Sequence, residues 1–185
     1  MQATCVATLE GHSGYVWSVA FHPTANLLAT GSRDRTAKLW HFSPDGSAEN
    51  NISAVCVATL EGHSSDVRSV AFHPTANLLA TGSTDNTAKL WLFSPDGSTA
   101  RCVATLEGHS ELVNSVAFDP TGTILATSSR DRTAKLWCFL PDGSTVTCVA
   151  TLEGHNDSIR SVTFHQRLPF LVTVSDDNSV KLWKL

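Results

Sequence analysis

The sequence predicts an all-β fold, namely a β-propeller built from four-stranded antiparallel blades, with four blades in the chain. A Gly-His pair and a closing tryptophan each occur four times, and both series step by 51, 46 and 46 residues. A period in the mid-forties is typical of propeller blades, which cannot bury their apolar faces alone. No segment carries apolar residues at helical spacing over about ten positions, so no helix is expected. The pairs are Gly11-His12, Gly62-His63, Gly108-His109 and Gly154-His155, and the tryptophans are Trp40, Trp91, Trp137 and Trp183.

The first repeat contains four β-prone segments. Residues 5–9 form a short apolar run that ends at Gly11, where glycine supports a sharp change of direction. Residues 16–21 are rich in apolar and β-branched side chains, and a His-Pro-Thr-Ala-Asn turn leads to a third strand at 27–31. A Ser-Arg-Asp-Arg turn leads to the fourth strand at 36–40. Each repeat therefore supplies the four strands of one blade.

The connection after the fourth strand differs between repeats. Residues 43–46 read Ser-Pro-Asp-Gly and predict a polar turn. The path from Trp40 to Cys56 spans 16 positions, whereas the two later equivalents span 11. The five extra residues, 48–52, predict a surface loop, because loop-closure entropy grows slowly with length.

The whole chain, residues 1–185, is expected to form a single propeller unit. Its repeats cover approximately 4–54, 55–100, 101–146 and 147–185. The sequence begins with an outer strand and stops just after the fourth closing tryptophan, which leaves the last blade without an outer edge. The N-terminal strand is expected to close the propeller by filling that edge, since an exposed edge invites aggregation.

Composition excludes several classes of partner. The 13 Lys and Arg residues against 17 Asp and Glu residues give a net charge of -4, so no general attraction to nucleic acid or to anionic membranes is expected. No apolar run approaches the roughly 20 residues of a membrane span. No signal segment is evident at the N-terminus, and a cytoplasmic location is expected. No cofactor motif appears.

The five cysteines predict neither disulfides nor a zinc site. Cys5, Cys56, Cys102 and Cys148 occupy the same position of the repeat, and equivalent positions are held apart by whole blades. Cys138 is a single extra thiol. An odd number without close spacing favours reduced, small apolar residues.

On these residues the chain resembles the WD-repeat β-propeller family. The Gly-His pair, an aspartate in the turn before the fourth strand and the Leu-Trp that closes it recur across nearly the whole chain. The family often has aspartate after the tryptophan, whereas His41, Leu92, Cys138 and Lys184 stand there in this sequence. That position is commonly relaxed, so the departure does not put the fold in doubt.

The resemblance implies a hydrogen-bonded tetrad of His, Thr, Asp and Trp within each blade. A hydroxyl, a histidine and an aspartate would also suit nucleophilic catalysis. Four identical copies ending in a tryptophan instead favour buried structural networks, so no enzyme is expected. The tetrads are His12, Thr30, Asp34, Trp40; His63, Thr81, Asp85, Trp91; His109, Thr127, Asp131, Trp137; and His155, Thr173, Asp177, Trp183.

Four lysines also recur at one position of the repeat: Lys38, Lys89, Lys135 and Lys181. They could form a basic stripe that binds phosphates. Their place inside apolar strands favours a different arrangement, in which the stems pack between blades and the ammonium groups reach the edge.

Repeats one and two differ at only seven of 44 positions, between residues 4–47 and 55–98. Five of the seven flank the two turns expected at one end of the propeller. This pattern predicts that one rim contacts a partner while the packing stays constant; drift confined to exposed turns is the alternative. The five pairs are Gly14/Ser65, Tyr15/Asp66, Trp17/Arg68, Arg33/Thr84 and Arg35/Asn86.

The resemblance supports a binding function, because this end of WD-repeat propellers commonly holds peptides or proteins. Four arginines on the rim favour an acidic or phosphorylated peptide. The rival interpretation is a purely structural propeller, recently amplified or engineered, with no dedicated ligand. The expected partner-binding residues are Tyr15, Trp17, Arg33, Asp66, Arg68, Thr84, Leu112, Asn114, Arg130, Ser158, Arg160 and Asp176.

Two further questions stay open at this level. Four blades could form a small ring alone, two chains could form an eight-bladed ring as a homodimer, or the repeats could belong to a longer array. A four-bladed ring could also bring His22, His73, Asp119 and His165 together as zinc ligands, although turn residues usually point to water. No metal site is expected.

Overall fold

The computed structural model describes residues 3–44, 52–140, 142 and 145–185. Over this part of the chain all regular structure is β, which confirms the all-β part of the predicted fold class. The structure therefore contains no described helix that could cross a membrane. The predicted turn at 43–46 and the predicted loop at 48–52 lie mostly outside the described residues.

The described strands form four antiparallel sheets, which we call blades 1 to 4. Blade 1 contains β1 (Val16–Phe21), β2 (Leu27–Ser32), β3 (Ala37–Pro44) and β4 (Ile52–Leu60). Blade 2 contains β5 (Val67–Phe72), β6 (Leu78–Ser83), β7 (Ala88–Phe93) and β8 (Ala100–Leu106). Blade 3 contains β9 (Val113–Phe118), β10 (Ile124–Ser129), β11 (Ala134–Phe139) and β12 (Val146–Leu152). Blade 4 has three strands, β13 (Ile159–Phe164), β14 (Phe170–Ser175) and β15 (Val180–Lys184).

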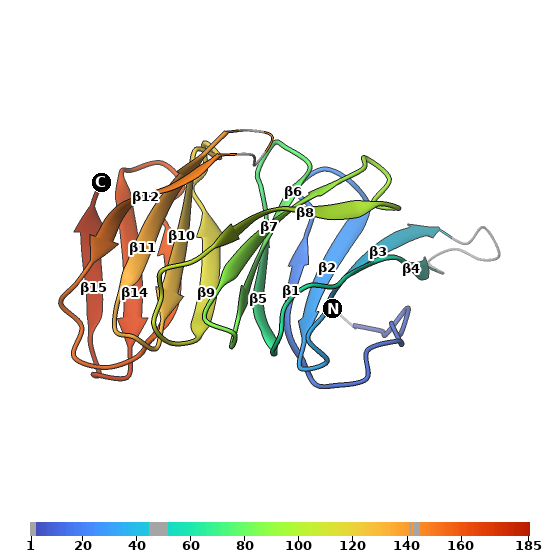
Figure 1. Cartoon of the computed structure of the whole chain (residues 1–185). Helices are drawn as coiled ribbons and strands as arrows, with labels where there is room; N and C mark the ends of the chain where they lie inside the picture. The colour runs from blue at the N-terminus through green and yellow to red at the C-terminus, as the bar shows by residue number, and fades with distance from the viewer. Residues whose placement is uncertain (1–2, 45–51, 141, 143–144) are drawn as a thin grey trace.

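The blades stand side by side in an open arc, from blade 1 in blue to blade 4 in red (Figure 1). Neighbouring blades pack through their first strands, β1 beside β5, β5 beside β9 and β9 beside β13. The hydroxyl of Ser18 accepts a hydrogen bond from the Val70 amide at 3.1 Å, and Ser69 does the same for Val116 at 3.1 Å. These bonds link one blade's inner strand to the next.

The core lies between blades, in contacts that we call seams. In the first seam, Ala29 and Leu39 of blade 1 are fully buried against Val67 and Val70 of blade 2. Gly31 sits so close to the next blade that an added Cβ would lie 2.9 Å from Cγ1 of Val67. The small side chains of one blade therefore set the distance to its neighbour.

The predicted N-terminal strand is absent from this single chain. Residues 3–12 form no strand, and the sheets do not close into a ring. A strand needs an edge to pair with, and the open edge of β15 lies at the far end of the arc from the N-terminus (Figure 1). Val6 and Leu9 instead line a hollow beside Phe21 and Trp40 of blade 1.

Three of the four recurrent lysines contact the outer strands. Nζ of Lys38 donates to Oγ1 of Thr59 at 2.8 Å, Lys89 to Thr105 at 2.8 Å, and Lys135 to Thr151 at 3.0 Å. Each ammonium group thus ties the third strand of a blade to the fourth. The five cysteines are free thiols, and all five are exposed.

The close packing of neighbouring blades across a seam yields a first prediction. Gly82→Ala should destabilise the fold by about 1 to 3 kcal/mol through overpacking, because the new Cβ would meet Val113 Cγ1 at 2.9 Å. Ser128 at the equivalent site of blade 3 is the described residue whose buried side-chain oxygen lacks a partner, so Ser128→Ala should be neutral or stabilising. Urea unfolding of both variants measures the contrast; equal effects would contradict this account of the seam.

Candidate functional site

Two loops of each blade meet at one end of the arc, and we call this surface the rim. One loop precedes the first strand and the other joins the second strand to the third. In blade 1 they are joined by a backbone bond from the Arg33 amide to the Tyr15 carbonyl at 2.8 Å, and in blade 2 from Thr84 to Asp66 at 2.9 Å. The same bond recurs in blades 3 and 4, from Arg130 to Leu112 and from Asp176 to Ser158, both at 3.0 Å.

An aspartate holds the second loop in shape. Oδ1 of Asp34 accepts hydrogen bonds from the amide and hydroxyl of Thr36, at 3.0 and 2.6 Å. Arg35 between them has a φ of 70°, a left-handed conformation that a side chain other than asparagine or aspartate rarely adopts. The three equivalent residues, Asn86, Arg132 and Asn178, share this conformation. The carboxylate therefore stabilises a turn that presents its side chains at the rim.

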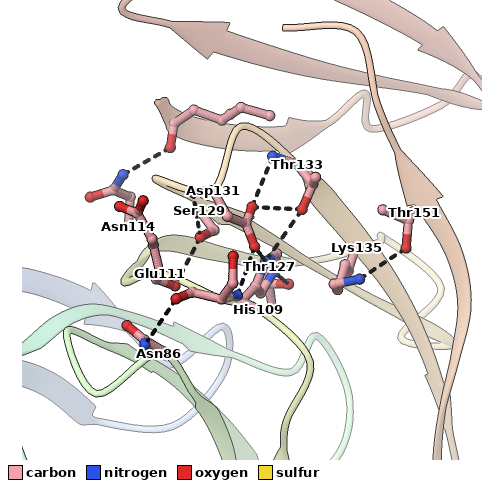
Figure 2. Close-up of polar contacts among 12 residues, drawn as sticks. Asn86, His109, Glu111, Asn114, Thr127, Ser129, Asp131, Thr133, Lys135 and Thr151 are labelled. Carbon is pink, nitrogen blue, oxygen red and sulfur yellow. Dashed lines mark hydrogen bonds and ion pairs between the residues drawn. The ribbon is translucent and has the colours of Figure 1, made fainter. Parts of the chain in front are cut away.

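The same aspartate belongs to the His-Thr-Asp-Trp network, and Figure 2 shows the His, Thr and Asp members of this network in blade 3. Nδ1 of His109 lies 2.7 Å from Oδ2 of Asp131, and Nε2 lies 2.7 Å from Oγ1 of Thr127. The indole of Trp137 donates to the same threonine oxygen at 2.9 Å. A neutral histidine satisfies all partners when Nδ1 donates to the carboxylate and the hydroxyl donates to Nε2.

The other blades contain equivalent networks at 2.7 to 2.9 Å. Thr81, Thr127 and Thr173 are fully buried, so these hydroxyls have no access to a substrate. A buried and fully partnered hydroxyl does not act as a nucleophile. The networks instead tie the rim loops to the sheet.

Hydrogen bonding keeps these aspartates ionised. Burial alone would raise the pKa of Asp131, but the hydrogen bonds from His109 and Thr133 hold that pKa well below its usual range. The pKa of the Asp177 carboxyl is also lowered, and the hydrogen bond from the hydroxyl of Ser179 is the largest cause.

On blades 1 and 2 the rim carries a row of four side chains in which two aromatic rings lie between two arginines. Cζ of Arg33 lies 5.6 Å from the centre of the Tyr15 ring, which meets the Trp17 ring edge-on at 5.9 Å. Cζ of Arg68 lies 5.0 Å from the centre of the Trp17 ring. Tyr15 is 67% exposed and Trp17 is 46% exposed. We call these four residues the rim ladder, and a shallow hollow beside it is lined by His12, Ser13, Gly14, Tyr15, Arg33 and Asp34.

On blades 3 and 4 the rim arginines are neutralised. Nε of Arg130 lies 3.2 Å from Oε2 of Glu111, and Nη2 of Arg160 lies 2.6 Å from Oδ2 of Asp176. Arg33 and Arg68 have no such partner within the described residues. Two of the four predicted rim arginines are therefore already paired with carboxylates.

Other predicted rim residues are engaged in local contacts. Nδ2 of Asn114 donates to the Ile159 carbonyl at 2.9 Å and to the Ser158 hydroxyl at 3.2 Å, linking blades 3 and 4 (Figure 2). The hydroxyl of Thr84 donates to Ser65 at 2.7 Å. Sequence reasoning missed Glu111, because the position-by-position comparison covered only the first two repeats.

In the loops that join the first strand to the second, at the end of the arc opposite the rim, His73 has a structural role. Nδ1 of His73 accepts bonds from the amides of Thr75 and Ala76, and its Nε2 lies 2.8 Å from the Gly122 carbonyl. His73 and Asp119 are buried, so the expectation that these turn residues point to water is wrong for both. Over the described ranges no cluster of three metal-ligating side chains occurs.

A family model described as "WD domain, G-beta repeat" matches four segments of the chain. They are residues 3–41, 54–91, 100–138 and 146–184. Together they cover most of the sequence, and each contains one complete His-Thr-Asp-Trp set.

Among known proteins, the chain is 40% identical over 95 residues to "Pre-mRNA-processing factor 19" of Oryza sativa subsp. japonica, covering 50% of this chain and 16% of that protein. It is 41% identical over 90 residues to "Probable cytosolic iron-sulfur protein assembly protein 1" of Malassezia globosa, covering 46% and 25%. It is 37% identical over 99 residues to "Ribosome biogenesis protein WDR12 homolog" of Oryza sativa subsp. japonica, covering 51% and 22%. The matched part is thus a quarter or less of each of these relatives.

The ionised aspartates yield a second prediction. Asp131→Asn should lower the free energy of unfolding at pH 7 by about 1.5 to 3 kcal/mol, the range for a hydrogen bond to a charged group. Because the folded-state pKa is depressed, the stabilisation is present above the unfolded pKa of about 4 and is lost as the pH falls below it. Urea unfolding at pH 7 and pH 3 should show the difference shrinking on acidification, with Asp66→Asn as control. A pH-independent difference would contradict this origin.

Proposed function

Because the chain belongs to the WD40 repeat family, we propose that it is a non-catalytic scaffold that binds a protein or peptide segment on the rim of blades 1 and 2. Proteins of this family are generally interaction scaffolds, and three relatives are named for processing, assembly and biogenesis. The observation that carries the proposal is the rim ladder. Exposed Trp, Tyr and Arg side chains are those most often responsible for binding energy at interfaces.

The charge of the ladder favours an acidic or phosphorylated peptide. Arg33 and Arg68 have no carboxylate partner among the described residues, so their guanidinium groups retain hydrogen-bonding capacity. Stacking over Tyr15 and Trp17 restricts their motion and keeps the donors outward. An arginine held in place can pair with a carboxylate or phosphate in a bidentate manner and loses less entropy on binding.

The remaining rim residues would surround this centre. Asp66 and Thr84 belong to blade 2, while Leu112, Asn114 and Arg130 of blade 3 and Ser158, Arg160 and Asp176 of blade 4 extend the rim. Ion pairs and hydrogen bonds already occupy much of blades 3 and 4. In this proposal the residues of blades 3 and 4 border the contact area, exclude water from its edge and contribute little affinity.

We also propose how the fold closes. Two chains form an eight-bladed ring, in which the N-terminal strand of each chain completes blade 4 of the other. Residues 5–9 repeat the Cys-Val-Ala-Thr-Leu of the outer strands at 56–60, 102–106 and 148–152. In blade 3, Lys135 stands opposite Thr151. The same register would place Thr8 opposite Lys181, where it would supply the hydroxyl that the other three lysines contact.

A cytoplasmic location is part of the same proposal. One relative is named as cytosolic, whereas the names of the others specify no compartment. Nucleic acid is not proposed as a partner, since the net charge is -4 and half of the rim arginines are paired.

The binding proposal predicts which arginines matter. In a screen of acidic and phosphoserine-containing peptides, Arg33→Gln with Arg68→Gln should weaken capture at least about tenfold, because each lost charge-assisted hydrogen bond contributes about 1.5 to 3 kcal/mol. The matched control, Arg130→Gln with Arg160→Gln, removes two ion-paired arginines and should change capture by less than about threefold. The free energy of unfolding of each double variant should lie within about 0.5 kcal/mol of that of the parent.

Two outcomes would overturn the binding proposal. If the parent captures no peptide or protein, the rival interpretation of a structural, amplified or engineered propeller becomes the better one. If both double variants lose capture equally, binding depends on overall charge and not on the rim ladder.

The two-chain ring has its own test. Light scattering should give twice the chain mass of 19.8 kDa at micromolar concentration. A variant that lacks residues 1–9 should shift toward the single-chain mass, because blade 4 then has no outer strand. A single-chain mass for the parent at every concentration would rule out the two-chain ring.

A further inference from the structure

The two ends of the arc expose apolar faces that are buried everywhere else in the chain. The open face of blade 1 consists of Val16, Val19 and Phe21, which are 53%, 61% and 69% exposed. Their counterparts in blade 2 are Val67, Val70 and Phe72; both valines are buried, and the phenylalanine packs in the first seam. The open face of blade 4 consists of Val172, Val174, Val180 and Leu182.

Each open face also carries half of a ring cluster that the first two internal seams contain complete. In the first seam, His22 of blade 1 lies 5.0 Å from Phe72 and 5.9 Å from Phe93 of blade 2. In the second seam, His73 lies 5.1 Å from Phe118 and 6.0 Å from Phe139. A histidine of one blade thus inserts against two phenylalanines of the next.

The missing halves are present at opposite ends of the chain. Phe21 and Phe42 on blade 1 already lie edge to face, with ring centres 5.8 Å apart, and no histidine covers them. His165 on blade 4 is exposed, and its Nδ1 accepts bonds from the amides of Arg167 and Leu168, as His22 does from its own turn. The two ends are therefore complementary in the same sense as two neighbouring blades.

The backbone is complementary as well. In the internal seams the Ser18 and Ser69 hydroxyls accept the amides of Val70 and Val116. Ser161 of blade 4 occupies the position of these serines, and Val19 of blade 1 occupies the position of these valines. A head-to-tail contact would restore this hydrogen bond.

The fit is nevertheless looser than in the internal seams, because blade 4 is bulkier there. In blade 1 the cross-strand row Ser18, Gly31 and Ala37 faces the next blade, and the corresponding row of blade 4 is Ser161, Val174 and Val180. In the neighbouring row, Ala29 is replaced by Val172. At Gly31 even a single Cβ would approach the opposing valine to 2.9 Å. Three valines cannot occupy this space at the spacing of the first two seams.

We infer that the open face of blade 4 receives blade 1 of a second copy, with His165 against Phe21 and Phe42, and that Val172, Val174 and Val180 hold this joint wider than the seams within the chain. The inference rests on the two-chain ring proposed above. A wider joint loses close contacts between the faces, so the two joints between the chains are weaker than the seams within each chain.

The decisive variant restores the internal pattern by Val172→Ala, Val174→Gly and Val180→Ala. The joint should then close to the internal spacing, and the dissociation constant of the two-chain species should fall by about tenfold or more. Sedimentation velocity over a dilution series measures it. Val55→Ala, an exposed valine on β4 that stands opposite His41, is the control and should leave association unchanged.

The outcomes separate the inference from the proposal on which it rests. A parent that remains a single chain at all concentrations overturns both. A parent that pairs, with a triple variant that pairs equally or more weakly, overturns only the inference, since the valines would then act as contacts and not as spacers. If the triple variant unfolds, Val174→Ser, which copies Ser128 of blade 3, should still tighten association, and weaker association would contradict the inference.

Discussion

In each blade, the hydrogen bonds that one shared aspartate accepts are the contacts on which the structure of the rim depends. Asp34 accepts hydrogen bonds from His12 and Ser13 of the first loop and from Thr36 of the second. Through His12 and Thr30 it is connected to the indole of Trp40 in the core. One carboxylate therefore holds two loops and a sheet together, and the residues between these anchors are free to vary without loss of packing. Tyr15 and Arg33 are two such residues.

Much of this arrangement is predictable because it is periodic. The strand at Val16–Phe21 has the predicted bounds, and the strands at 27–32 and 37–44 begin within one residue of them. The structure places the members of each His-Thr-Asp-Trp set in contact, as for His63 and Asp85 at 2.7 Å. Such contacts lie within one repeat, so a repeated sequence pattern carries most of the information that they require.

What the sequence alone could not reveal depends on positions where the later repeats differ from the first two, on contacts between repeats, or on a free edge. The pairing of Arg130 with Glu111 involves a rim carboxylate at a position where the first repeat has Gly14. The strand expected at residues 5–9 requires the edge of β15, which a single open arc does not bring near it. Similarly, the effect of the three valines of blade 4 on packing can be inferred only from the distance between Gly31 and Val67. Spacing along the chain contains no measure of that distance.

The proposed binding mode combines a rigid frame with one exposed patch on the rim, and the five tryptophans offer a direct way to observe both. Four indoles donate within the buried networks, whereas Trp17 lies exposed in the rim ladder. A two-dimensional NMR titration with a captured acidic or phosphorylated peptide should therefore move the Trp17 indole signal together with the Arg33 and Arg68 Nε signals, and leave the other four indoles in place. Shifts in the four buried indoles, or saturation of binding without a shift at Trp17, would contradict this binding mode.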